Sequence, residues 1–368
     1  MSVSSDCLII GGGLIGMLTA REFALAGMQV QLLERGNLGT ESSWAGGGIL
    51  SPLYPWRYAA PVSVLARESH AIYRELIDNI RQESGIDPEL RQSGLLMPAC
   101  DEVDEAKQWA AQYGADLQQL DAKQCTECAP ELAPTIAEQG ALWLPKVTQV
   151  RNPRFVKALK RSLEQLGVKI ATQQSVSTIL VEKGVAKGAQ TQDEHYYADN
   201  VVITMGAWSA DLLDGLGKRP EIAPVKGQML LYKTPKDSIK RVILHQDRYV
   251  IPRKDGRVLV GSTLEHVGFD KSTTDSAKAD IVASAERIAP LLVNCEIERH
   301  WAGLRPGSPS GIPYIGGHQT ISQLYVNAGH YRYGVILGPA SARLITDIVL
   351  NNKTKIHSEP YSIDAERD

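Results

Sequence analysis

The feature that most constrains the fold is a glycine-rich turn directly after an apolar run near the N-terminus. Cys7 to Ile10 is short, apolar and partly β-branched, as in a buried parallel strand, and it leads into Gly11-x-Gly13-x-x-Gly16. The pattern from Leu14 to Leu25 predicts a helix packed closely on a sheet, and Met28 to Leu33 predicts the next strand. Residues 1–34 should therefore form a βαβ unit with a right-handed crossover.

This turn and the end of the second strand predict a dinucleotide site. Glycines at 11, 13 and 16 permit a tight turn, close approach of a pyrophosphate and close packing of the helix. Glu34, at the end of the second strand, offers a carboxylate to ribose hydroxyls. The spacing alone does not separate NAD from FAD.

A second glycine-rich stretch, Ser42 to Ile49, follows the unit. Such a backbone can lie flat against an extended ring system, although small residues also mark ordinary flexible loops. A nicotinamide enzyme needs no second cradle, whereas a flavin must be buried along its whole length. The stretch therefore favours FAD.

Length and charge exclude several classes of protein. At about 150 residues per domain, 368 residues predict two domains or one large domain with an insertion. The apolar fraction of 43% and the charged fraction of 22% exclude disordered, collagen-like and coiled-coil proteins. The net charge of -3 provides no field that would attract nucleic acid.

The 5 cysteines are odd in number and sparse, which predicts a reducing compartment and a cytoplasmic protein. We expect no signal peptide and no membrane span, because charged residues interrupt each long apolar run. Cys125-x-x-Cys128 has no second pair and no histidine at ligand spacing, so we interpret both as structural thiols and expect no metal site.

The rest of the chain shows mixed periodicities. Helical patterns cover residues 63–83, 101–112 and 153–166. Strand patterns cover 168–171, 176–181, 201–204, 229–232, 249–252 and 258–262. At the C-terminal end, a strand at 324–327 precedes a helix at 340–350, which should complete the N-terminal sheet. This arrangement predicts a discontinuous nucleotide domain with a substrate domain inserted in its middle.

Two arginines and one tyrosine are candidates for a second ligand. Arg305 lies in a Gly/Pro-rich segment that predicts a rigid turn, and Arg332 lies in an aromatic turn bounded by Gly329 and Gly334. Fixed guanidinium groups suit bidentate binding of a carboxylate. Tyr249, at the start of a predicted strand, is placed to reach the same ligand. The alternative is two surface arginines and an ordinary strand tyrosine.

Together these motifs resemble the FAD-dependent D-amino-acid oxidase superfamily, and most of all the glycine oxidases of thiamin biosynthesis. The resemblance rests on residues 9–16, 45–50, 249–253, 301–307 and 328–334. It implies a mixed α/β fold with a Rossmann-like FAD-binding domain and an inserted substrate domain built on a mainly antiparallel sheet. We expect residues 1–80, 148–220 and 305–368 in the first domain, and 81–147 and 221–304 in the second.

The resemblance also implies roles for individual residues. The cofactor would be bound by the glycine turn of Gly11, Gly13 and Gly16, by Leu14 and Ile15 at the pyrophosphate, by Glu34 and Arg35 at the adenosine, by Ser42 and Ser43 on the phosphate side, by Gly47, Gly48 and Ile49 against the isoalloxazine, by Val176 at the adenine, and by Gly334, Val335 and Ile336 beside the flavin. Arg305 would bind the substrate carboxylate, Tyr249 would assist it and Arg332 would line the amine side.

Two differences from related families affect the predicted cofactor linkage and substrate range. Sarcosine oxidases carry a flavin-linked cysteine after the Arg-Pro pair, where this chain has residues 307–311 without cysteine, so we expect FAD to be non-covalent. Some glycine oxidases place methionines or a histidine near the substrate, where this chain has Ile49, Leu264 and Asp247. The substrate range therefore stays open.

The implied activity is oxidative deamination of glycine, other small amino acids or N-alkylglycines. The products would be a 2-oxo acid, ammonia or an amine, and hydrogen peroxide, with molecular oxygen as acceptor. Three alternatives remain: a D-amino-acid dehydrogenase that uses another acceptor, a sarcosine oxidase-like enzyme, and a non-catalytic flavin-binding subunit. Partners would be the carboxylate substrate and oxygen, without nucleic acid or membrane, and a homo-oligomer is compatible with the sequence.

Overall fold

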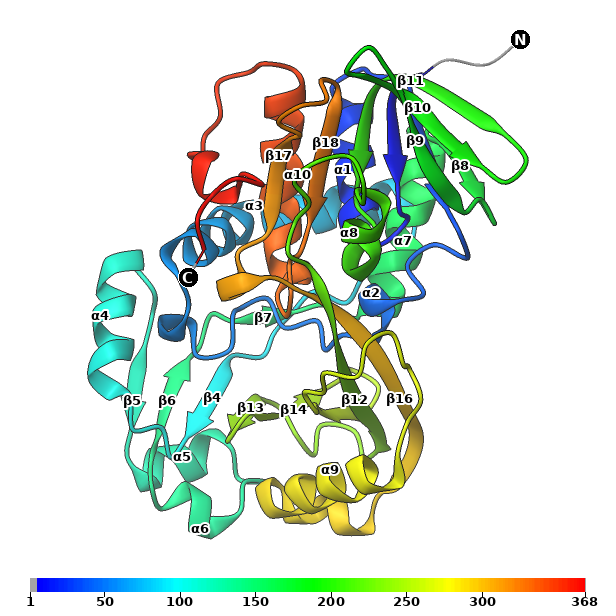
Figure 1. Ribbon diagram of the computed structural model, residues 1–368. Coiled ribbons are helices and arrows are strands. Elements are labelled where there is room, and N and C mark those ends of the chain that lie inside the picture. Colours follow the sequence, from blue (N-terminus) through cyan, green and yellow to red (C-terminus); the bar gives the residue numbers. More distant parts are fainter. Residues whose placement is uncertain (1–4, 368) are drawn as a thin grey trace.

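Two large sheets form the two halves of the molecule in a computed structural model that describes residues 5–367. Figure 1 shows the second sheet lying beyond the carboxyl ends of the parallel strands of the first. The expected mixed α/β fold with a Rossmann-like half is confirmed. Among residues 5–367, no helix is long and apolar enough to cross a membrane.

The N-terminal βαβ unit is confirmed from Ser5 onward, and residues 1–4 lie outside the described part. β1 (Ser5–Ile10), α1 (Leu14–Leu25) and β2 (Val30–Glu34) follow one another, and β1 pairs in parallel with β2. Because both strands are buried on both faces, they read as nearly continuous apolar runs. Both strands end at the glycine turn, which places Glu34 beside it.

The remaining strands of the first sheet come from the middle and the end of the chain. They are β8 (Lys169–Thr172), β9 (Val176–Glu182), β10 (Val185–Thr191), β11 (His195–Ile203), β17 (Tyr314–Gly317) and β18 (Leu324–Ala328). The main order is β17-β18-β11-β1-β2-β8, with β9 and β10 extending antiparallel from β11. The expectation that the C-terminal strand completes this sheet is confirmed, because β18 pairs in parallel with β11.

The last helix begins earlier than predicted. α10 spans Gly334–Val349, and the predicted start at Ala340 was wrong because Pro339 lies inside the helix. A proline in a helix leaves the carbonyl four residues earlier without its usual donor. Here that carbonyl belongs to Val335, and the hydroxyl of Tyr73 donates to it at 2.9 Å. A partner from another helix thus makes the interior proline tolerable.

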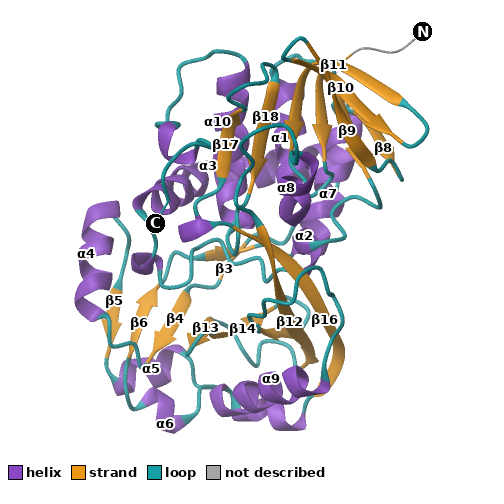
Figure 2. Cartoon of the chain, viewed as in Figure 1, coloured by secondary structure: helices purple, strands orange, loops and turns teal. Residues whose placement is uncertain are grey.

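The second sheet is mainly antiparallel, as expected. Its order is β16-β12-β15-β14-β13-β4-β6-β5, and only β13 and β4 pair in parallel. The strands are β4 (Leu95–Pro98), β5 (Gln118–Leu120), β6 (Ala141–Leu144), β12 (Ala223–Lys233), β13 (Val242–His245), β14 (Arg248–Pro252), β15 (Arg257–Gly261) and β16 (Glu296–Gly307). A separate pair, β3 (Arg91–Gln92) and β7 (Thr148–Gln149), lies between the halves (Figure 2).

Helices cover the outer faces of both sheets. On one face of the first sheet, α1 packs against α10 and α7 (Asn152–Gln165), and α3 (Ala60–Ser84) packs against the same two helices. The second half carries α4 (Val103–Tyr113), α5 (Ala122–Cys128), α6 (Pro134–Ala137) and α9 (Asp275–Ile288). The short α2 (Ser42–Ala45) and α8 (Ser209–Leu212) lie near the junction. The exact division of the chain into two domains stays a prediction.

Candidate cofactor and substrate site

A cavity of ≈ 390 Å³ opens between the two sheets. Its walls include most of the residues singled out from the sequence: Gly11, Gly13, Leu14, Ile15, Glu34, Arg35, Ser42, Ser43, Gly47, Gly48, Ile49, Val176, Tyr249, Arg305, Arg332, Gly334 and Val335. Gly16 and Ile336 do not line it; Ile336 is in the core, and Gly16 packs α1 against the turn. One cavity therefore joins the candidate cofactor residues to the candidate substrate residues.

At one end of the cavity, the glycine turn has a geometry that side chains would block. Gly11 has φ 109°, and a Cβ added there would lie 2.7 Å from the carbonyl oxygen of Thr204. A Cβ on Gly16 would collide with the Gly11 carbonyl oxygen. The Glu34 carboxylate accepts the backbone N–H groups of Gly12 and Gly36, each at 2.8 Å. Glu34 thus stabilises the turn besides facing the cavity.

The N-terminus of α1 points its amides at the same space. Gly13 is the N-cap residue and provides no side chain to satisfy these amides. The N–H of Leu14 donates to the hydroxyl of Ser43 at 2.8 Å, and Asn152 Nδ2 donates to the Ser43 carbonyl at 2.9 Å. A helix N-terminus whose N-cap residue has no side chain, with a serine hydroxyl beside it, is suited to binding a phosphate group.

Arg253, which we did not single out from the sequence, binds the backbone of the second glycine-rich stretch. Arg253 is only 6% exposed; its Nη2 donates to the Gly47 carbonyl at 2.8 Å and its Nη1 to Gln149 Oε1 at 2.6 Å. Burial lowers the pKa of Arg253 to about 10, so it stays charged at neutral pH. The available signal was its place at the end of the 249–253 motif.

The glycine cradle, residues 46–48, has no room for side chains at Gly47 and Gly48. Gly48 has φ 74°, and a Cβ there would clash with the Val150 carbonyl oxygen and lie 2.6 Å from Asn152 Oδ1. A Cβ on Gly47 would lie 2.6 Å from Ile251 Cδ1. Gly47 and Gly48 line the cavity without side chains, which fits the close approach of a planar ring system, while the turn and the α1 N-terminus fit a pyrophosphate. These residues fit FAD.

At the other end of the cavity, Arg305 is held on a strand rather than in a turn. The predicted Gly/Pro turn at this position was wrong, because residues 296–307 form β16. β16 is the edge strand of its sheet, so Pro306 needs no donor toward a further neighbour. The Arg305 guanidinium donates to Ser262 Oγ at 2.5 Å, to the Thr263 carbonyl at 3.2 Å and to the Lys226 carbonyl at 3.3 Å. Burial lowers its pKa.

Tyr249 and Arg332 reach the same region from other elements. The Tyr249 hydroxyl on β14 donates to Met229 Sδ at 3.6 Å. Arg332 lies in a turn after β18, as predicted, and Tyr331 beside it has φ 44°. Burial disfavours the charge on Arg332, but the phenol of Tyr333 and other nearby phenols raise its pKa overall. Two cationic groups thus face one cavity, an arrangement suited to a carboxylate ligand.

Two other residues at this end were also missed. Gly227 and Ser262 both line the cavity beside Arg305. Gly227 lies outside the predicted strand 229–232, which the structure extends to 223–233, so that strand pattern carried no signal for it. Nothing in the sequence connects Ser262 with Arg305.

The Cys125-x-x-Cys128 pair lies in α5, outside the walls of the cavity. Cys125 is buried in the core beside α6 and β6, and burial raises the pKa of its thiol to about 11. A thiol with this pKa is mostly protonated at neutral pH, so it is a poor nucleophile.

Comparison with known proteins gives a consistent family. Residues 6–348 match the family described as FAD dependent oxidoreductase. A glycine oxidase from Pseudomonas aeruginosa is 43% identical over 98% of this chain and 99% of its own length. The crystal structure of glycine oxidase from Geobacillus kaustophilus superposes with a TM-score of 0.93 at 27% identity, covering 99% of this chain and 100% of that one.

Another relative is named as a bifunctional protein. The bifunctional protein ThiO/ThiG from Synechocystis sp. is 31% identical over 96% of this chain, which spans 53% of that longer protein. The family match covers both strands of the glycine turn, the cradle and β16, so the walls described above lie inside it. The chain belongs to the FAD-dependent oxidoreductase family, in the group that includes the glycine oxidases.

Proposed function

We propose that this FAD-dependent enzyme oxidises glycine, and with it other small amino acids and N-alkylglycines. The products are a 2-oxo acid, ammonia or an amine, and hydrogen peroxide. The observation that carries the proposal is the guanidinium of Arg305, fixed by three acceptors in the same cavity as the glycine cradle. Relatives with the printed name glycine oxidase support it.

Each residue at the substrate end has a role in this proposal. Arg305 binds the carboxylate through its planar fork, Tyr249 orients the same group, and Arg332 lines the amine side. Bound FAD supplies the acceptor for two electrons. The chain therefore needs orientation and charge complementarity at this end more than a general base.

The acceptor and the biological setting belong to the same proposal. We infer that molecular oxygen reoxidises the enzyme and that the reaction takes place in the cytoplasm. Relatives named ThiO/ThiG support a contribution to the thiazole of thiamin. An enzyme that served this route would supply the oxidised product of glycine.

The test is oxygen uptake by the purified enzyme with glycine, sarcosine and D-alanine in turn. We expect uptake with glycine and one equivalent of hydrogen peroxide. Reduction of an artificial quinone by these substrates without oxygen uptake would contradict the oxidase and favour the dehydrogenase alternative. Turnover of sarcosine alone would favour the sarcosine oxidase-like alternative.

We also propose that the FAD is held without a covalent bond. The cavity walls in the described part of the chain include no cysteine. Acid precipitation should release all of the flavin into the supernatant, where its absorbance is measured. Flavin retained in the washed pellet would show a covalent link.

A further inference from the structure

Lys226 has a buried side chain with no place in the reaction so far described. It lies on β12, is 2% exposed, and its Nζ contacts Asp270 Oδ2 at 2.9 Å, the Ser272 carbonyl at 3.2 Å and Glu265 Oε2 at 3.2 Å. An ammonium group has three N–H donors, so these acceptors satisfy all of them. A buried charge satisfied in this way is costly to leave unpaired, and it therefore fixes its partners in place.

All three acceptors belong to residues 262–274, which connect β15 to α9. Backbone bonds tie this connecting segment to β12 as well: the Lys226 N–H donates to the Glu265 carbonyl at 2.9 Å, and the Glu265 N–H to the Lys226 carbonyl at 3.0 Å. Gln228, which is fully buried, donates from Nε2 to Glu265 Oε1 at 2.9 Å. Lys226 and Gln228 thus hold the connecting segment on one face of β12.

The opposite face of β12 meets Arg305. Successive residues of a strand point to opposite faces, and Gly227 between these two residues points at the guanidinium. Two of the acceptors of that guanidinium, Ser262 Oγ and the Thr263 carbonyl, are the first residues of the connecting segment. The third acceptor is the carbonyl of Lys226 itself. Glu265 links this group of acceptors to the ammonium of Lys226, because it pairs with Lys226 Nζ and its carboxylate also accepts the Thr263 hydroxyl.

We propose that Lys226 is a positioning residue for the carboxylate-binding arginine. By binding Glu265 and Asp270, it holds Ser262 and Thr263 where they orient the Arg305 fork. The inference rests on the role of Arg305 in the proposed function. A shift of about 1 Å in such a group can cost about 100-fold in rate, so a device that fixes the fork has a measurable effect.

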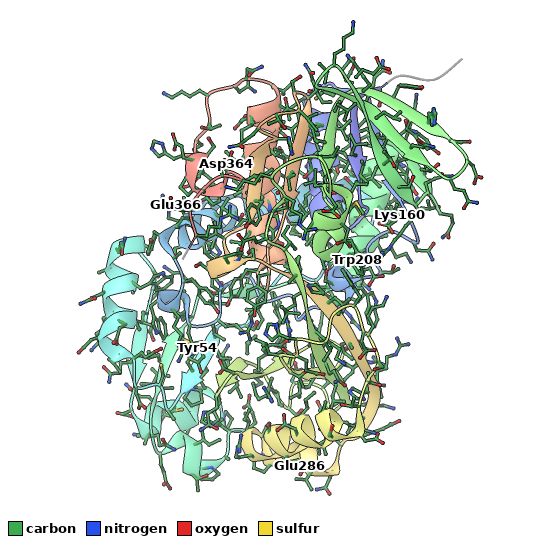
Figure 3. The ribbon with its side chains drawn as sticks, in the orientation of Figure 1. Tyr54, Lys160, Trp208, Glu286, Asp364 and Glu366 are labelled. Atoms are coloured by element: carbon green, nitrogen blue, oxygen red, sulfur yellow. The ribbon has the colours of Figure 1, made fainter. Side chains whose placement is uncertain are left out.

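The outer part of the connecting segment has its own anchors on the cofactor half. The ring of Phe269 stacks on Trp208 with a centroid distance of 5.3 Å, and Lys271 Nζ lies 3.0 Å from Glu41 Oε1. Trp208 lies at the junction of the two halves (Figure 3). These contacts should keep the segment folded when Lys226 is replaced, so the loss is expected at Arg305 and not throughout the protein.

The test measures carboxylate binding without turnover. Acetate is titrated into FAD-loaded enzyme, and its Kd is read from the change in flavin absorbance. Lys226→Met keeps an unbranched apolar side chain of similar size and removes the ammonium group; we expect the Kd for acetate to rise about tenfold or more, with FAD affinity unchanged within twofold. The matched control is Lys233→Met on the same strand, because Lys233 is 65% exposed and its ion pair with Glu296 is 4.0 Å long. It should leave both constants unchanged.

A double-mutant cycle separates positioning from a general loss of stability. In the Arg305→Lys background the fork is already lost, so adding Lys226→Met should change the Kd for acetate less than threefold. The full tenfold effect in that background would overturn the proposal, as would wild-type acetate affinity in Lys226→Met alone.

A milder variant covers the case in which Lys226→Met does not fold. Asp270 is 47% exposed, so Asp270→Asn removes one partner of the ammonium at little cost to the fold. We expect a rise of roughly two- to fivefold in the Kd for acetate; unchanged affinity would overturn the proposal. Because acetate is not oxidised, an enzyme that shows these shifts but does not consume glycine would refute the proposed substrate and leave the role of Lys226 standing.

Discussion

Gly227 on β12 lies directly against the guanidinium of Arg305 on β16: a Cβ added at residue 227 would be 2.5 Å from Arg305 Cζ and would clash with both terminal nitrogens. Gly227 has an ordinary strand conformation, so space is what restricts this position to glycine. The absence of a side chain at one residue thus creates the room for the charged group of another.

Gly227→Ala should therefore impair substrate binding while leaving the fold intact. Overpacking by one methyl group costs about 1–3 kcal/mol, and here the guanidinium is the group that must move. We expect kcat/KM for glycine to fall about tenfold, mostly through KM, with normal FAD content. The control is Gly317→Ala on β17, where a Cβ would make an ordinary contact of 3.7 Å with the Tyr325 ring. Equal kinetics for both variants would show that the guanidinium has other room.

Arg305→Ala tests the carboxylate-binding role directly. A carboxylate bound in this cavity without its guanidinium partner is desolvated and unpaired, which costs several kcal/mol. We expect kcat/KM for glycine to fall at least about 100-fold, and Arg305→Lys to recover only part of the loss, because an ammonium offers a point charge and not a planar fork.

The flavin itself provides the control for both variants. FAD content and visible spectrum should stay normal, since Arg305 bonds to residues of β12 and of the connecting segment. If Arg305→Ala consumed low concentrations of glycine at nearly the wild-type rate, the carboxylate site would have to be assigned to Arg332.

Glu34→Ala should weaken FAD binding. A pair of charge-assisted hydrogen bonds to ribose hydroxyls is worth about 1.5–3 kcal/mol, or roughly 10- to 100-fold in affinity. The variant also loses the acceptors of the Gly12 and Gly36 N–H groups, which adds to the effect by loosening the turn. Titration of apoprotein with FAD measures the change, and KM for glycine at saturating FAD should move little. An unchanged FAD affinity would show that Glu34 does not bind the cofactor and is only a carboxylate at the end of a strand.

The sequence predicts the parts of this site that are continuous along the chain. The glycine turn, the first helix and Glu34 depend on local patterns, and α1 has the predicted bounds of Leu14 and Leu25. The start of α10 was misplaced because the hydroxyl that satisfies the carbonyl exposed by Pro339 comes from Tyr73, far away in sequence. A local sequence pattern covers only neighbouring residues, so none contains both Tyr73 and Val335.

The same limit explains why a turn was wrongly predicted at Arg305. Pro306 and Gly307 are typical turn residues, but an edge strand tolerates them because one side of it needs no donors. Ser262 and Lys226 contact Arg305 only because β12 pairs with β16 on one side and β15 on the other. Arg253 was missed because a charged side chain after a strand is ordinarily exposed, whereas this one is buried against the Gly47 carbonyl.

His330 predicts a pH dependence of stability. It is buried, its Nε2 lies 2.9 Å from Ser341 Oγ, and the Ser341 hydroxyl donates in turn to the Leu337 carbonyl at 2.8 Å. The serine proton is therefore engaged, so Nε2 must be the protonated nitrogen of a neutral imidazole. Burial lowers the pKa of His330 to about 3.

The sign of the effect follows from that pKa. The unfolded chain binds a proton at His330 below about pH 6.5, whereas the folded protein does so only near pH 3. Between these values the unfolded state holds more protons than the folded state. The contribution of His330 to the free energy of unfolding is therefore complete above pH 6.5 and is lost as the pH falls toward 3. From pH 6.5 to pH 4.5 the loss is at most about 2.7 kcal/mol.

His330→Gln removes this titration while keeping a side-chain amide for Ser341. We expect the variant to be less stable than wild type at pH 7, and the difference in unfolding free energy to shrink by about 2 kcal/mol by pH 4.5. Urea unfolding at saturating FAD at both pH values measures this, with His357→Gln as control because His357 is 95% exposed. A stability difference between wild type and His330→Gln that is the same at both pH values would mean that His330 has the same pKa in the folded and the unfolded protein.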